Sequence, residues 1–161
     1  MKLNDVLQKI AVKLRGASAS DGDIQLLKSR LPRALVPDWF IQLVTDYKLA
    51  GACFSLNKED DDSKLGAKII WLSAEQIVSE AIDVEPGISV LSSGFLPIGA
   101  CGLGSGDPYF LDLRRSSNDP PLVRIPHDYA AIHPYPLERV EVVTPTLADF
   151  FSKAGPCGAL T

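Results

Sequence analysis

A glycine-rich segment at residues 102–106 separates two short apolar runs, and it constrains the fold more than any other feature. Gly102, Gly104 and Gly106 occupy alternate positions, and Asp107-Pro108 follows directly. The apolar residues before the segment are Phe95, Leu96 and Ile98, and those after it are Tyr109, Phe110, Leu111 and Leu113. Glycine permits positive φ and close backbone approach, so the chain can turn sharply here. The pattern therefore predicts two neighbouring β-strands joined by a tight turn.

Helical and extended patterns surround this strand pair. Apolar residues at steps of three and four predict helices near residues 3–14, 23–31, 37–48, 73–83 and 146–154. Short apolar runs predict further strands near 51–56, 68–72, 122–125 and 140–143. Because several strands follow one another at hairpin spacing, we expect an α+β fold. Its sheet should be largely antiparallel, with helices packed on one face.

Several helix ends carry local signals. Ser73 and Gln76 have the spacing of a capping box. Asp23 is expected to cap the second helix, and Pro37 suits the first turn of the third. Gly155 stands where the last helix should end, in the position of a C-terminal cap.

Size and charge limit the function. The 161 residues fit one domain, in which residues 31–161 form the main body and residues 1–30 a helical N-terminal segment. A net charge of −4 argues against nucleic-acid binding, which needs a positive surface, but permits a basic protein partner. No apolar run approaches the roughly 20 residues of a membrane span, so a membrane partner is not expected either.

The cysteines suggest a reducing compartment. Cys53, Cys101 and Cys157 are odd in number and widely spaced, so neither a disulfide framework nor a zinc site is expected. The first residues interrupt their apolar positions with charges, unlike a signal peptide. These features together predict a cytoplasmic protein.

The motifs do not match known reaction centres. A dinucleotide loop needs its third glycine one residue later and a helix after it, and a nucleotide P-loop needs lysine where Asp107 stands. His127 next to Asp128 suggests a base and its orienting acid, or with His133 a metal site, but a surface histidine is the simpler interpretation. Asp107 and Asp112 differ by an odd step and should lie on opposite strand faces. We therefore expect no catalytic residue, cofactor or metal.

The acidic residues are expected to have structural roles. Asp107 can accept backbone N–H bonds that fix the glycine turn, and Asp112 can do similar work at the end of its strand. Four acids in succession, residues 59–62, lack the alternating oxygen ligands and central glycine of a calcium loop. We expect them to form a solvated loop or hairpin tip.

An ordered set of short motifs resembles the SUKH superfamily, which includes fungal regulators of cell-wall synthesis and many bacterial immunity proteins. The similarity covers about residues 31–153. Its motifs are Leu31-Pro32 before an aromatic-rich helix, Trp71-Leu72-Ser73, Phe95-Leu96-Pro97-Ile98-Gly99, Gly104-x-Gly106-Asp107-x-Tyr109-x-Leu111-Asp112, Val123 before Pro126-His127-Asp128, and Leu147-x-x-Phe150-Phe151.

This resemblance implies a non-enzymatic protein-binding module. The leading expectation is an immunity protein that neutralises a toxin, with a regulatory scaffold as the alternative. A small-ligand-binding protein or hydrolase built on the glycine turn is the second alternative. The resemblance points to Gly104, Gly106, Asp107, Tyr109 and Asp112 as shared motif residues. Charge alone suggests that Asp60, Asp61 and Asp62 form an acidic face for a basic toxin domain.

Overall fold

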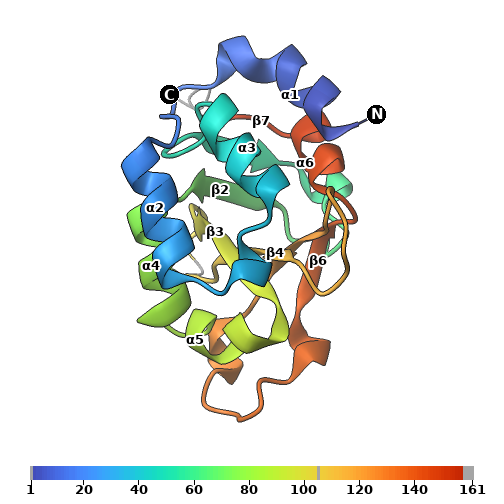
Figure 1. The fold of residues 1–161 in the computed structure, drawn as a ribbon. Helices are drawn as coiled ribbons and strands as arrows, with labels where there is room; N and C mark the ends of the chain where they lie inside the picture. The colour runs from blue at the N-terminus through green and yellow to red at the C-terminus, as the bar shows by residue number, and fades with distance from the viewer. Residues whose placement is uncertain (1, 105, 158–161) are drawn as a thin grey trace.

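The computed structural model, which describes residues 2–104 and 106–157, is an α+β fold built on one curled seven-stranded sheet (Figure 1). The strand order is β6-β5-β4-β3-β2-β1-β7, and every neighbouring pair is antiparallel. The strands are β1 (Cys53–Leu56), β2 (Ala67–Trp71), β3 (Phe95–Cys101), β4 (Tyr109–Asp112), β5 (Leu122–Arg124), β6 (Glu141–Thr144) and β7 (Gly155–Pro156). The sheet is thus a meander to which the chain returns once, at β7. This confirms the predicted fold class.

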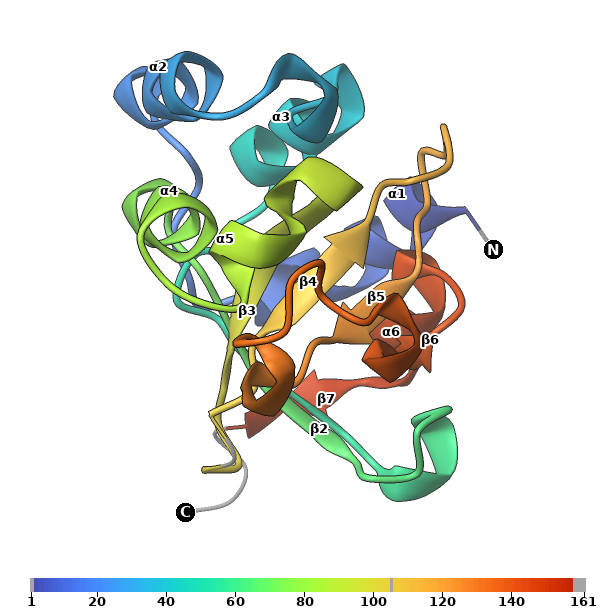
Figure 2. The same cartoon turned by 90° about the horizontal axis from the view of Figure 1, so that it is seen from below.

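Six α-helices accompany the sheet in the described part of the chain. They are α1 (Leu3–Ile10), α2 (Asp21–Arg30), α3 (Asp38–Asp46), α4 (Ala74–Ile82), α5 (Gly87–Val90) and α6 (Leu147–Lys153). Figure 2 shows α2, α3, α4 and α5 gathered on one side of β3 and β4. Helix α2 packs on α4, and α1 packs on α6. None of these helices has the length and apolar character that a membrane crossing requires.

The strand pair around the glycines is a β-hairpin, as predicted. Leu96 faces Leu111 and Gly99 faces Tyr109 across β3 and β4, with an irregularity in register between Pro97 and Gly99. The turn takes the chain through positive φ at Gly104 (88°) and Gly106 (80°). Residues with a Cβ rarely adopt that conformation, which is why glycine occupies both positions.

The two faces of the central strands supply two separate cores. Leu96, Tyr109, Leu111 and Leu122 join the main core under the helices. Their chain neighbours point to the opposite face because side chains alternate along a strand. There Phe95, Phe110 and Val123 pack with Val90 of α5, Ile125 and Tyr135 in a second, smaller core. This second core supports the loops at residues 126–140, where the candidate site lies.

The N-terminal helices contribute to the main core. Val6, Leu7, Leu14 and Leu27 are all buried in it. Between the two helices, the backbone N–H of Gly16 donates to the carbonyl of Lys48, and Ala17 bridges to Ala50. The residues expected to form a helical N-terminal segment therefore pack directly on the main body.

Two of the expected helix caps need correction. Asp23 is not the N-cap of α2: Ser20 is, and Asp23 completes a capping box by accepting the Ser20 backbone N–H. Gly155 does not cap α6: the helix ends at Lys153 with Ala154 as its C-cap, because the chain extends at once into β7 to pair with β1. The capping box of Ser73 and Gln76 is present as predicted.

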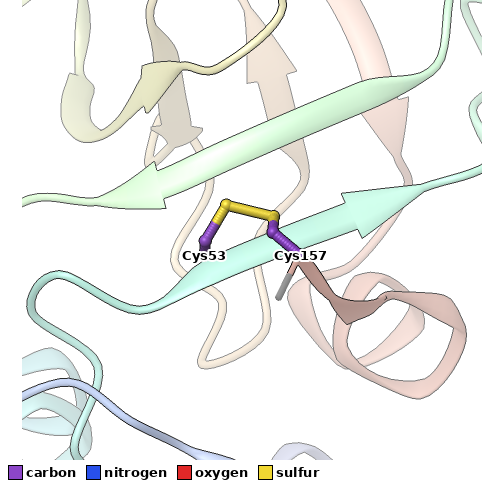
Figure 3. The surroundings of a disulfide bond; sticks show 2 residues. All are labelled: Cys53 and Cys157. Carbon is purple, nitrogen blue, oxygen red and sulfur yellow. A yellow bond between two sulfur atoms is a disulfide. The ribbon is translucent and has the colours of Figure 1, made fainter. Parts of the chain in front are cut away.

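The expectation that the cysteines form no disulfide is wrong. Cys53 on β1 and Cys157 just after β7 are joined by a disulfide bond (Figure 3). Pairing of β7 with β1 brings their Cα atoms to 5.4 Å although 104 residues separate them in sequence. Sequence spacing carries no information about such a contact, because it is created by the chain's return to the edge of the sheet.

Candidate functional site

The glycine turn ends at a contact between Asp107 and His127. One oxygen of Asp107, Oδ1, accepts the backbone N–H of His127 at 3.0 Å and contacts ring atom Nδ1 at 2.5 Å. The other ring nitrogen, Nε2, lies 3.5 Å from Oδ1 of Asp128. The imidazole is therefore held between two carboxylates, and Asp107 ties the β3–β4 turn to the segment that follows β5.

A polar cavity of about 350 Å³ opens beside this contact. It is formed by the end of the glycine turn, the segment after β5, and the start of β6. Its lining residues are Asp107, Pro126, Asp128, Tyr129, Glu138, Arg139, Val140 and Glu141. Three separate pieces of chain thus converge on one opening, which we call the acidic cavity.

Negative charge dominates the acidic cavity. Asp107, Asp128, Glu138 and Glu141 supply four carboxylates against the single guanidinium of Arg139. That guanidinium lies over the Tyr129 ring, 4.9 Å from the ring centre, so it is held at the wall. Asp128 and Glu138 are exposed. The arrangement suits a cationic group entering from solvent.

Tyr135 supports the cavity from the second core. It is buried, and its hydroxyl donates a hydrogen bond to the carbonyl of Pro126 at 2.5 Å. Burial, reinforced by the charge of Asp107, raises the pKa of Tyr135 to about 12. The phenol is therefore neutral at physiological pH and keeps the proton that this hydrogen bond needs.

Arg124 on β5 connects Glu141 of the cavity wall to the acidic loop, the segment of residues 59–62. Its guanidinium donates to the carbonyl of Gly66 at 2.7 Å and to Ser63 Oγ at 2.9 Å, and lies 3.3 Å from Asp61 Oδ2. It also reaches Glu141 Oε1 at 3.4 Å on the cavity wall. Burial opposes its charge, but hydrogen bonding to Tyr109 and the charge of Asp61 raise the pKa of Arg124 above its usual value.

The motif residues are not assembled into one surface. Asp107 lines the acidic cavity, and Gly104 and Gly106 are exposed on the adjoining turn. Tyr109 is fully buried, with its hydroxyl accepting a hydrogen bond from Arg124. Its role in this structure is packing and support of Arg124.

Asp112 lies at the other end of β4 and pairs with Arg114. Its carboxylate accepts the Arg114 backbone N–H at 3.1 Å and the guanidinium at 2.8 and 2.9 Å. Burial alone would raise the pKa of Asp112, but these hydrogen bonds and the Arg114 charge outweigh it and lower the pKa. The backbone contact matches the role predicted for Asp112 at its strand end.

The expected acidic face at residues 60–62 needs correction. Asp61 is completely buried, where it accepts hydrogen bonds from the backbone and side chain of Ser63 and pairs with Arg124. Asp60 is half-buried, and only Asp62 is exposed. The buried Arg124 needs a counter-charge, and Asp61 supplies it, so this carboxylate is not available on the surface.

Sequence reasoning missed Arg124, Glu138, Arg139 and Glu141. Arg124 had a usable signal, because a charge inside the apolar strand sequence Leu122–Ile125 must find a buried partner. Glu138 and Arg139 lie in the short turn before β6, and Glu141 is the first residue of β6; no pattern in the sequence marked these three. The described residues contain no group of three or more His, Cys, Asp or Glu side chains able to hold a metal ion.

No family model, curated protein or solved structure matches this chain. The protein is therefore described by its fold and its cavity. It is an α+β protein with an antiparallel curled sheet. At one edge of that sheet lies a cavity whose charged lining residues are four carboxylates and one guanidinium.

Proposed function

We propose that this chain is a SUKH-like, non-enzymatic protein-binding module, specifically an immunity protein that neutralises a basic toxin. The observation that carries the proposal is the acidic cavity, which includes the motif residue Asp107 and offers carboxylates to a partner's lysine or arginine. A toxin that acts on nucleic acid needs a positive surface, and blocking that surface would abolish its activity.

Charge reversal in the cavity is expected to abolish protection. A partner captured from the source organism is co-expressed with this protein, and growth is measured. Wild type should rescue growth, and the variant Asp128→Lys/Glu138→Lys should fail and bind the partner at least ~10-fold more weakly. Both residues are exposed, so the fold should tolerate these changes.

Two further variants locate the effect. Asp46→Lys/Asp83→Lys changes the net charge by the same amount at exposed positions where α3 and α4 end, and cations are favourable there. This control should rescue growth like wild type. Glu59→Lys/Asp62→Lys tests the exposed part of the acidic loop. Full rescue by the cavity variant would contradict the proposal, and loss of rescue only in the loop variant would move the interface there.

The regulatory scaffold remains the alternative within the same resemblance. It too would bind a protein partner and would leave the acidic cavity as the contact surface. Gene context separates the two, since a toxin gene immediately upstream supports immunity and its absence favours the scaffold.

A hydrolase is a second candidate of a different class, favoured by the contact between Asp107 and His127. In that case Asp107 would orient the imidazole of His127 through Nδ1 and leave Nε2 as the general base. The assay is hydrolysis of ester, peptide and phosphodiester substrates by wild type and His127→Gln. The protein-binding proposal expects no turnover, and turnover that disappears in the variant would replace it.

We also propose that the protein acts in the cytoplasm, where a delivered toxin would meet it. The structure joins Cys53 and Cys157 in a disulfide, and such bonds are rare in the cytoplasm, so the redox state of this pair in growing cells tests the proposed compartment: a cytoplasmic protein should carry it reduced. Rapid alkylation of intact cells, followed by mass spectrometry, measures their state. A fully oxidised pair would instead place the protein in an oxidising compartment.

A further inference from the structure

A second cavity, of about 580 Å³, lies at the other edge of the sheet from the acidic cavity. It is formed where α1 and the segment after it meet β1 and β7. Most of its lining is apolar: Ile10, Leu14, Ala52, Phe54, Ala154 and Pro156. Leu14, Ala52 and Phe54 are also buried members of the main core. Its volume is in the range of small-molecule sites, which are typically apolar with a few placed polar groups.

The charged residues of this apolar cavity are both cations. Lys13 and Arg15 belong to its lining, and no described carboxylate does. Both side chains belong to exposed residues, so they can meet a head group at the mouth. Arg15 is further fixed by donating a hydrogen bond to the carbonyl of Val12 at 2.9 Å. In a chain of net charge −4, these two cations form a local inversion of charge among the described lining residues.

We propose that this cavity binds a single-chain amphiphile with a carboxylate head, such as a medium-chain fatty acid. The alkyl chain would occupy the apolar lining along Leu14 and Phe54, where burial removes it from water. The carboxylate would lie at Lys13 and Arg15, where charge-assisted hydrogen bonds are available. The proposal is independent of toxin binding, because the two cavities share no residue.

The disulfide holds one wall of the apolar cavity. Strand β7 pairs with β1 through only two residue pairs, and Pro156 has no N–H to donate. The bond between Cys53 and Cys157, both lining residues, is the covalent link that keeps this short strand in place (Figure 3). The binding experiment therefore uses the full chain in its oxidised form.

Calorimetric titration with three probes tests the proposal. Sodium decanoate should bind with one-to-one stoichiometry, and octanoate should bind more weakly by roughly 4-fold for each methylene lost. Decyltrimethylammonium carries the same chain with the opposite charge and should bind at least ~10-fold more weakly than decanoate. No saturable decanoate binding, or equal binding of the cationic probe, would overturn the proposal.

Matched charge variants locate the site. Lys13→Glu/Arg15→Glu should weaken decanoate binding at least ~10-fold, whereas Lys9→Glu/Lys28→Glu should leave it within about 2-fold. All four residues are exposed, and only the first pair lines the cavity. Equal loss in both variants would indicate a general charge effect and overturn the site. Light scattering gives the remaining outcome: a dimer that persists with excess decanoate and excludes it would assign the apolar cavity to a second copy of the chain.

Discussion

Replacing both Cys53 and Cys157 by alanine is expected to lower the free energy of unfolding by about 2–4 kcal/mol. The disulfide closes a loop spanning 104 residues, so its removal frees most of the chain in the unfolded state. The chain-entropy account gives ~4.7 kcal/mol for a loop of about this size, and measured effects are usually smaller. Urea unfolding of the variant and of the oxidised wild type, without reductant, measures the difference.

Reductant supplies the control for this comparison. Adding it should move the wild-type midpoint to that of the double variant and leave the variant itself unchanged. The pairing of β7 with β1 then depends on its two residue pairs and on the packing of α6 alone. Identical midpoints for oxidised and reduced wild type would show that the bond does not stabilise the fold, contrary to this expectation.

The parts of the fold that were predictable are those specified by local chemistry. The β3–β4 hairpin follows from glycines that take positive φ at Gly104 and Gly106 between two apolar runs. The start of α4 follows from Ser73 and Gln76, which satisfy each other's backbone donors within four residues. In both cases the residues that specify the structure are also the residues that make the contacts.

The parts that were not predictable depend on contacts between distant segments. The prediction of an exposed acidic face was wrong because Asp61 points inward and contacts Arg124, 63 residues away in sequence. The disulfide was missed for the same reason, since it depends on the pairing of β7 with the distant strand β1. The acidic cavity needs the second core to fold the loops after β5 against Tyr135, and no local pattern describes that packing. Of the motif residues, Asp107 lines the acidic cavity, whereas Tyr109 is buried.

Arg124→Met is expected to destabilise the protein by about 3–5 kcal/mol, because it leaves the carboxylate of Asp61 buried without its counter-charge. The side chains of Arg124 and Asp61 are 4% and 0% exposed. The guanidinium also binds the carbonyl of Gly66 and lies over the Tyr109 ring, 5.1 Å from its centre. Methionine fills much of the same volume but replaces none of these polar contacts. Chemical denaturation gives the change in the free energy of unfolding.

Arg114 provides the matched control, since it pairs with Asp112 and lies over the Phe95 ring at 4.9 Å. Its side chain is 46% exposed, so water can replace the lost partner and Arg114→Met should cost only about 0–1 kcal/mol. The double variant Arg124→Met/Asp61→Leu removes both buried charges and should recover much of the stability lost in Arg124→Met. Equal costs at Arg114 and Arg124 would mean that burial does not set the strength of these contacts. A double variant less stable than Arg124→Met would mean that the Asp61 hydrogen bonds to Ser63, not its charge pair, hold the acidic loop on the sheet.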